Sequence, residues 1–249
     1  MRTDQAAIGH AEPPEHAFAP DVPQPVVPTA IPSTAALHAL IDEADRYLAW
    51  LPGPGVADVR AGLAAWRGGP VTPAGRPTGN PVVSAHLSMA LARLGRDRPA
   101  LAHAIGEAAP ALDWTSYDRY PPAAIGAAFA AGHAYARIIG DGAAVPARDF
   151  ALGLFLIAPD VFYRDHCHPA PELYVPLTGP HGWRFAPGAP LSVKDAHEPV
   201  WNPPERPHAI KAGAAPFLCL YGWTRDVDLP ARVIPADDWQ ELEDLRLPP

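Results

Sequence analysis

Four side chains that could hold a metal ion or act beside one recur at even positions between residues 166 and 174. They are His166, His168, Glu172 and Tyr174. Successive side chains of an extended chain point to opposite faces, so these four would share one face of a strand. The apolar odd positions Leu173, Val175 and Leu177 indicate that both faces are buried, where an unpaired charge is costly. Imidazole and carboxylate groups are metal ligands, so the spacing favours a metal site over a solvated polar face.

A fourth ligand candidate, His208, follows the Pro-rich segment 202–207. A turn of this kind before a strand would present the histidine at the start of that strand. Three histidines and one glutamate make a mixed nitrogen and oxygen set, which suits Zn, Fe(II), Mn, Co or Ni. We therefore expect one divalent transition metal with open positions for a substrate, its identity to be decided by geometry.

Composition restricts the classes of function. The chain has 249 residues, 48% of them hydrophobic, and a formal net charge of −8. This charge argues against a nucleic-acid partner, and no apolar run reaches the length of a membrane span. The two cysteines and the absence of a secretory signal favour a cytoplasmic protein. We expect a small-molecule substrate as the partner and leave the oligomeric state open, a homodimer included.

The first half of the chain divides into a Pro-rich segment and a helical region. Prolines crowd residues 1–32 and predict disorder there. From residue 33, apolar spacings of three and four predict a helix that ends before residue 52, and a second helix covers 56–66. Asn80 and Pro81 are typical of a helix start, and a further helix covers 99–108. We interpret residues 33–120 as a helical cap.

Short strand candidates then recur between turn signals, which predicts a mainly β domain over residues 121–235. The expected strands cover 134–139, 150–157, 173–177, 182–185, 190–193, 196–201, 208–211, 217–223 and 231–234. Many short strands with regular turns suggest an antiparallel sandwich or barrel. A final acidic helix over about 236–245 is expected within the terminal segment 236–249.

The spacing around the first cluster resembles the first motif of the cupins, His-x-His-x-x-x-Glu followed by six residues and glycine. His166, His168, Glu172 and Gly179 match it, whereas Asp160 stands where a glycine is usual. The second motif, Pro-x-Gly-x-x-His, is matched by Pro203 and His208, with Glu205 in place of its glycine and Ala212 in place of the later asparagine. The resemblance implies a cupin barrel, a double-stranded β-helix or jelly roll, that holds one divalent metal.

Three segments resemble the cupin dimethylsulfoniopropionate (DMSP) lyases more narrowly. They are residues 172–179, 208–210 and 217–223. This resemblance implies a helical part before the barrel and a metal-dependent cleavage of DMSP to dimethyl sulfide and acrylate. It also implies that Tyr174, two residues after the ligand glutamate, is the base that starts the β-elimination. The wider family includes members with other substrates, so the motifs do not settle the substrate.

That chemistry agrees with the residue types. A metal that binds the substrate carboxylate would stabilise the charge that develops when the neighbouring proton is removed. A free tyrosine has a pKa near 10, and a nearby divalent cation favours its phenolate. Aromatic faces attract a sulfonium group. The aromatic candidates for its pocket are Tyr221, Trp223, Trp183, Tyr163 and Trp201.

Two other classes of function remain open. One is a cupin metalloenzyme of another kind, such as an Fe(II) dioxygenase or an isomerase that acts on a different small carboxylate. The other is a non-catalytic cupin that binds a ligand.

Overall fold

The helices of the N-terminal part form where their capping residues and apolar spacing predict them. The computed structural model describes residues 33–74 and 79–248, so the disorder expected for residues 1–32 lies outside the described residues. The side chain of Ser33 caps the first helix, and that of Asn80 accepts hydrogen bonds from the backbone of Val82 and Val83 at the start of another. These helices are α1 (Thr34–Trp50), α2 (Val56–Trp66), α3 (Pro81–Asp97) and α4 (Pro99–Ala108), followed by the 3₁₀ turn η1 (Ala109–Ala111). Among the described residues, no helix is long and apolar enough to cross a membrane.

The alanine-rich stretch after the cap is helical in its first half and forms a strand in its second half. Its first half forms the short helices α5 (Pro122–Ile125) and α6 (Ala127–Ala131), and its second half forms β1 (His133–Gly140). The remaining strands are β2 (Val145–Pro146), β3 (Ala151–Ile157), β4 (Phe162–Cys167), β5 (Glu172–Pro176), β6 (His181–Arg184), β7 (Ser192–Lys194), β8 (Val200–Asn202), β9 (His208–Lys211), β10 (Phe217–Trp223) and β11 (Arg232–Val233). The helix α7 (Trp239–Asp244) follows them.

Most strand predictions are confirmed, and three need correction. The strand expected over 196–201 is limited to β8, because residues 195–199 form a turn in which His197 has a φ of 71°. The strand expected over 190–193 is displaced to β7. Strand β4 was not among the expected strands, although it carries the first histidine of the motif. The expectation that His166, Glu172 and Tyr174 share one face of a single strand is therefore wrong, because His166 lies in β4 of one sheet and the other two lie in β5 of the other sheet.

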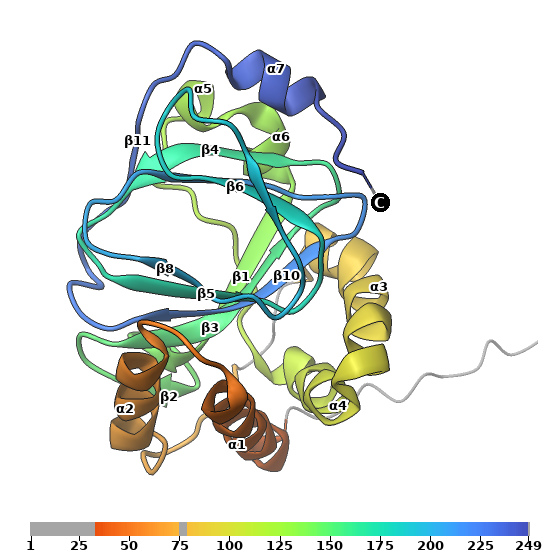
Figure 1. Ribbon diagram of the computed structural model, residues 1–249. Coiled ribbons are helices and arrows are strands. Elements are labelled where there is room, and N and C mark those ends of the chain that lie inside the picture. Colours follow the sequence, from red (N-terminus) through yellow and green to blue (C-terminus); the bar gives the residue numbers. More distant parts are fainter. Residues whose placement is uncertain (1–32, 75–78, 249) are drawn as a thin grey trace, which may run out of the picture.

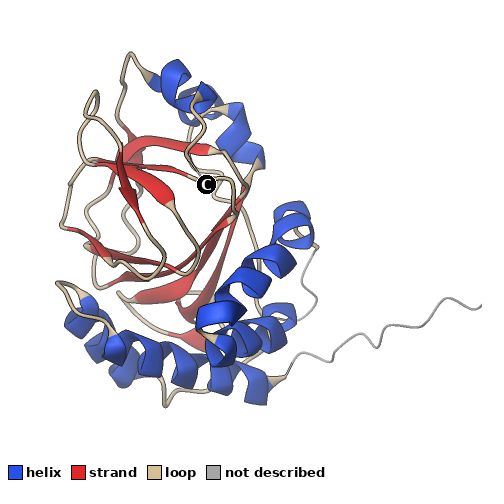
Figure 2. Cartoon of the chain, turned by 45° about the vertical axis from the view of Figure 1, so that its right-hand side comes forward, coloured by secondary structure: helices blue, strands red, loops and turns tan. Residues whose placement is uncertain are grey.

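The strands form two facing sheets, which confirms the expected cupin-type jelly-roll barrel behind a helical part (Figure 1). One sheet has the order β2-β1-β3-β10-β5-β8 and is called sheet A here; the other has the order β11-β4-β9-β6-β7 and is called sheet B. The pairings are antiparallel except for β1 with β2. Figure 2 shows the strands at the centre with helices outside them. The barrel interior is therefore the space between the two sheets.

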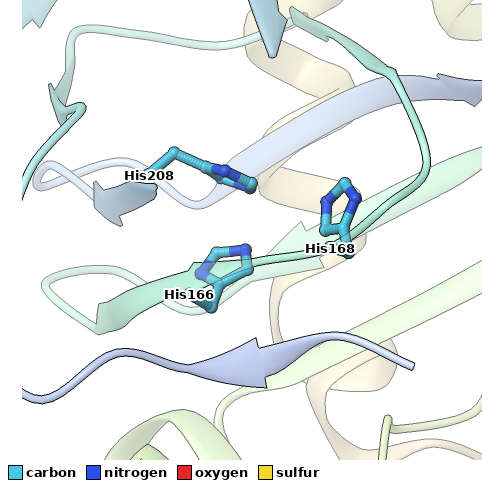
Figure 3. Close-up of side chains that lie close together, drawn as sticks. All are labelled: His166, His168 and His208. Carbon is cyan, nitrogen blue, oxygen red and sulfur yellow. The ribbon is translucent and has the colours of Figure 1, made fainter. Parts of the chain in front are cut away.

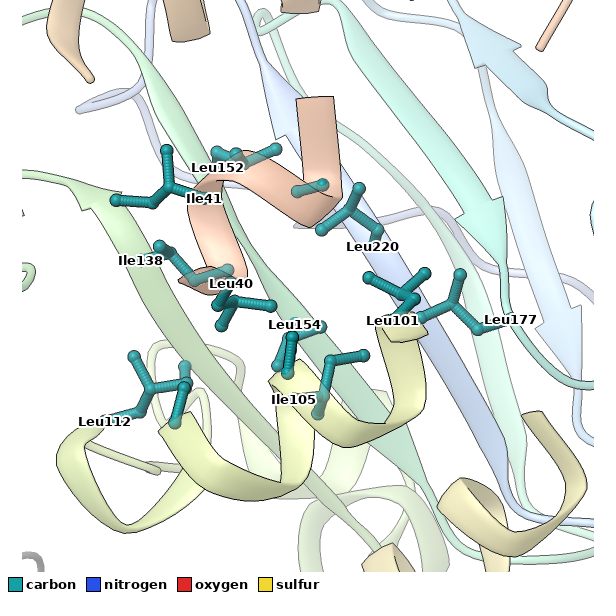
Figure 4. Packing of buried hydrophobic residues seen from close by; sticks show 14 of the residues in the cluster. Leu40, Ile41, Leu101, Ile105, Leu112, Ile138, Leu152, Leu154, Leu177 and Leu220 are labelled. Atoms are coloured by element: carbon teal, nitrogen blue, oxygen red, sulfur yellow. The ribbon is translucent and has the colours of Figure 1, made fainter. Parts of the chain in front are cut away.

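The helical layer packs on the outer face of sheet A, away from the barrel interior. Leu152 and Leu154 of β3 and Leu220 of β10 point toward α1 and α4 (Figure 4). The alternate residues of the same strands, Phe155 and Tyr221, belong to a second cluster inside the barrel. Strand alternation thus gives sheet A an aliphatic outer face and an aromatic inner face.

The outer face of sheet B is covered by α7 (Figure 1). The buried Arg184 of β6 donates to Asp165 of β4 (Nε to Oδ1, 2.9 Å) and to Asp238, the residue before α7 (Nη1 to Oδ2, 2.6 Å). Lys211 is also buried, and its ammonium group donates to the carbonyl of Glu243 in α7 (3.0 Å). These contacts hold α7 on the outer face of sheet B: Arg184 is paired with carboxylates, and Lys211 is hydrogen-bonded to backbone carbonyls.

Candidate metal centre

Three buried histidines meet between the two sheets. His166 lies in β4, His168 directly after it, and His208 at the start of β9; one ring nitrogen of each lies within 4.8 Å of the others. Register explains the meeting, because His166 and His208 are direct cross-strand partners. Figure 3 shows the three rings around a common space.

Backbone carbonyls set the tautomer of all three rings. Nδ1 lies 2.8 Å from the carbonyl of Arg164 in His166, 2.8 Å from that of Ala170 in His168, and 2.9 Å from that of Arg206 in His208. A carbonyl oxygen can only accept, so each Nδ1 carries a proton, and Nε2 is the nitrogen of each ring that faces the shared space. Ring orientation by a backbone carbonyl is also the usual outer contact of a metal-binding histidine.

Two of these Nε2 atoms have no partner. Nε2 of His166 and Nε2 of His208 are buried and make no hydrogen bond with the described residues. Burial, together with the neighbouring histidines, holds the pKa of His166 well below its usual value. A buried neutral nitrogen without a donor is costly in a protein core. A metal ion accepts such lone pairs, so the residues fit a metal site.

Glu172, the first residue of β5, adds a carboxylate to the histidines. Its Oε2 lies 3.0 Å from Nε2 of His168 and 3.5 Å from Nε2 of His208. Its Oε1 accepts a hydrogen bond of 2.6 Å from the indole nitrogen of Trp223. Burial opposes ionisation, but the contacts with His168 and His208 outweigh it and lower the pKa of Glu172. Burial likewise disfavours the charged form of His168, yet Glu172 raises the pKa of His168.

Tyr174 lies two residues further along β5, on the same inner face. It is 4% exposed, and its ring centroid lies 6.1 Å from that of His208. Burial, and then the charge of Glu172, raise the pKa of Tyr174 well above its usual value. In the absence of a nearby cation, the hydroxyl is therefore protonated at neutral pH.

A cavity of about 260 Å³ connects this cluster with the surface. His168, Glu172 and Tyr174 lie along its inner part, and the segments 115–120 and 227–231 contribute to its outer wall. Three of the expected pocket residues, Tyr163, Tyr221 and Trp223, line it. The ring of Tyr163 also stacks on that of His166 at 3.8 Å. The cavity thus brings aromatic faces and candidate metal ligands together.

The other two expected pocket residues lie elsewhere. Trp183 is fully buried behind Tyr174, with ring centroids 5.5 Å apart, and is not part of the cavity wall. Trp201 is a correction to the sequence analysis: it pairs with Leu173 and points to the outer face of sheet A. There its ring occupies the space that a side chain at Gly55 would need. Its neighbours in β8, Val200 and Asn202, lie on the opposite face of the strand, which faces the barrel interior.

Tyr120 and Arg137 are among the cavity residues that were not predicted from the sequence. The hydroxyl of Tyr120 lies 2.6 Å from that of Tyr163, and Arg137 lines the cavity from β1. Tyr120 lies in an irregular segment, so no helix or strand periodicity in the sequence indicates that it reaches the cavity. Arg137 could have been predicted from the sequence, because His133, Tyr135 and Arg137 alternate with the small or apolar residues of the same strand.

Comparisons with known proteins agree with this architecture. The family model described as dimethylsulfoniopropionate lyase matches residues 70–219, more than half of the chain. The DMSP lyase DddQ from Ruegeria pomeroyi DSS-3 has a similar fold, with a TM-score of 0.59 and 21% identity over 83% of this chain and 98% of that one. A structure of the DMSP lyases RdDddP and RnDddQII gives a TM-score of 0.57 and 21% identity over 81% and 98%. No curated protein sequence matches the chain significantly.

Proposed function

The chain belongs to the dimethylsulfoniopropionate lyase family, and on that premise we propose that it is a metal-dependent lyase that cleaves DMSP into dimethyl sulfide and acrylate. One observation carries the proposal. A single cavity contains Tyr174, the Glu172 carboxylate and an edge of the three-histidine cluster, in which two Nε2 lone pairs lack partners.

The ligands of the proposed ion are His166, His168, His208 and Glu172, a set that suits one divalent transition metal such as Zn, Fe, Mn, Co or Ni. When bound, such an ion would supply the positive charge that favours the Tyr174 phenolate and stabilises the negative charge developing on the substrate. The outer contacts of the histidines hold their rings in the orientation that this role requires.

In the proposed reaction, the Tyr174 oxygen takes a proton from the carbon next to the substrate carboxylate. The electron pair of that C–H bond forms the C=C bond of acrylate, and the C–S bond breaks. Its electron pair leaves on sulfur as neutral dimethyl sulfide. The proton on Tyr174 then returns to solvent through the cavity.

Aromatic side chains would hold the sulfonium end of the substrate. Tyr221 and Trp223 line the cavity, and the ring of Trp223 is oriented by its hydrogen bond to Glu172. A cation over such a face gains about 0.5–2 kcal/mol.

The test is to supply purified, metal-loaded protein with DMSP and to measure dimethyl sulfide and acrylate. We expect the two products in equal amounts, and we expect Tyr174→Phe to lower kcat by about 10²- to 10⁴-fold. Tyr47→Phe, which removes a hydroxyl on α1 outside the cavity, serves as the matched control. No dimethyl sulfide from the wild type, or equal rates for Tyr174→Phe and the wild type, would refute the proposal. Oxygen uptake with Fe(II), or tight binding of a small carboxylate without turnover, would identify the other two classes of function.

A further inference from the structure

A lateral row of three inner residues crosses sheet A at Glu172. Trp223 of β10 pairs with Glu172 of β5, and Glu172 pairs with Asn202 of β8. Direct cross-strand partners lie on one face of a sheet, with their Cβ atoms about 4.5–5.5 Å apart. The indole N–H of Trp223 donates to Oε1 of Glu172 at 2.6 Å. Because β8 lies on the other side of β5, Asn202 flanks the same carboxylate from the opposite direction.

The carboxamide of Asn202 is buried without a hydrogen-bond partner. Its side chain is fully buried, and neither Oδ1 nor Nδ2 bonds to any of the described residues. A buried amide without partners costs stability, whereas a leucine, with the same branched skeleton, would carry no such cost. The next inward residue of β8, Val200, is apolar and belongs to the cluster inside the barrel. Packing of the barrel therefore does not account for an amide at Asn202.

The chain after Asn202 leads directly to a candidate ligand. The turn of residues 203–207 connects β8 with His208 at the start of β9. The backbone N–H of Glu205, within this turn, donates to the carbonyl of His168 at 2.9 Å. This hydrogen bond holds the turn against the histidine cluster, so the amide of Asn202 lies beside the candidate metal centre.

Metal binding changes the donors that are available to Glu172. In the structure, Nε2 of His168 lies 3.0 Å from Oε2 of Glu172 and acts as its donor. A histidine nitrogen that binds a metal ion carries no proton, so it cannot donate a hydrogen bond. Oε2 then loses this donor, although a carboxylate oxygen has two lone pairs and accepts both an ion and a hydrogen bond. On the neighbouring strand β8, Nδ2 of Asn202 is a donor without a partner.

We propose that Asn202 is a positioning residue of the metal centre, and that its Nδ2 donates to the Glu172 carboxylate when this carboxylate binds the ion. Trp223 and Asn202 then hold the carboxylate from both sides and fix its orientation toward the histidines. Hydrogen bonds to a metal-binding side chain typically change metal affinity by about 10- to 100-fold. The inference rests on the metal site of the proposed function and adds to it a residue that touches neither ion nor substrate.

The experiment measures the Co(II) affinity of the full chain without turnover. Chelator-treated protein is titrated with Co(II) against a competing chelator, and the visible absorption of the bound ion is followed. Asn202→Leu keeps the branched skeleton and removes both polar atoms, so we expect Co(II) binding to weaken by about 10- to 100-fold. The urea midpoint of the metal-free protein should not fall, since the amide has no partner to lose. Asn202→Val tests the same loss with a smaller side chain, in case leucine does not fit.

Val200→Ala is the matched control, because it alters the packing of the same face of β8 and removes no polar atom. Its urea midpoint should fall, and its Co(II) affinity should equal that of the wild type. A purely structural role of Asn202 would produce this same pattern in the Asn202 variants.

The proposal is overturned if folded Asn202→Leu and Asn202→Val bind Co(II) as tightly as the wild type, or if Val200→Ala weakens binding as much as they do. Either result leaves the histidine and glutamate ligands, and with them the proposed function, in place. A wild type that binds no Co(II) would overturn the role of Asn202 and the metal site of the proposed function together.

Discussion

The two faces of sheet A are built from the same strands but differ in chemistry. The outer face carries Leu152, Leu154 and Leu220, which are buried against α1 and α4 and contain no polar side-chain atom. The inner face carries Tyr174 and Tyr221 and looks toward histidines whose Nε2 atoms lack partners. Aliphatic packing stabilises a fold without requiring a ligand, whereas buried polar atoms without partners cost stability until a ligand satisfies them.

Strand parity therefore separates the residues that stabilise the fold from the residues that face the candidate site. A substitution on the outer face should lower the free energy of unfolding and leave the chemistry of the folded molecules unchanged. A substitution that removes an unpartnered inner atom should change the chemistry of the folded molecules and leave the free energy of unfolding nearly unchanged.

The largest effect is expected at His208. His208→Asn keeps a donor for the carbonyl of Arg206 but removes Nε2, one of the two unpartnered atoms. Losing a ligand should weaken metal binding by at least about 100-fold, beyond the 10- to 100-fold typical of outer contacts. The stability of the metal-free protein should change by less than about 1 kcal/mol. Metal titration and urea unfolding measure the two quantities, and His103→Asn on the exposed side of α4 is the control.

A large loss of metal-free stability in His208→Asn, with metal affinity intact, would contradict the separation. In that case His208 would be a residue of the core and the histidine cluster would not bind the metal.

The largest effect on stability is expected on the outer face. Leu154 is fully buried beneath the helical layer (Figure 4), so Leu154→Ala should lower the free energy of unfolding by about 2–5 kcal/mol through lost burial and a residual cavity. Its metal affinity should equal that of the wild type. Urea unfolding checks the first statement and metal titration the second. Met89→Ala, at an exposed position of α3, should change stability by less than about 0.5 kcal/mol.

A smaller effect sharpens the distinction within the barrel interior. His181 is as buried as His208, but its nitrogens have protein partners: Nδ1 accepts from the backbone of Gly213 at 3.0 Å, and Nε2 lies 3.2 Å from the hydroxyl of Thr178. Burial lowers the pKa of His181 to about 3, against about 6.5 in an unfolded chain. As pH falls below 6.5, the unfolded state binds the proton first, so stability is lost progressively down to the folded-state pKa.

The expected loss from His181 is about 2–3 kcal/mol between pH 6.5 and pH 4.5. Urea unfolding at pH 7 and pH 4.5 measures it, and His181→Asn should reduce the difference by that amount because asparagine does not titrate. An equally steep pH dependence in His181→Asn would show that other groups cause the loss. Metal affinity at pH 7 should be unchanged in this variant.

Local sequence patterns predicted much of the fold and part of the candidate site. Caps and apolar spacing located α1, α2, α3 and α4, and parity placed Glu172 and Tyr174 on one inner face. The expectation that His166 shares this strand face was wrong, because His166 lies in β4 of sheet B and reaches Glu172 across the barrel interior. Trp201 was predicted to line the pocket only because it is aromatic, whereas its position in β8, opposite Leu173, places it on the outer face of sheet A. Tyr120 reaches the cavity from an irregular segment, and such contacts depend on tertiary packing that no local pattern encodes.

The most direct test of the account is to titrate metal-free protein with a divalent ion and to follow dimethyl sulfide release from DMSP. Activity is expected to rise linearly and to reach its maximum at about one ion per chain, with at least one of Zn, Fe(II), Mn, Co and Ni. His208→Asn should show no such rise at the same ion concentrations. Full activity in the metal-free protein, or no dimethyl sulfide with any of these ions, would contradict it.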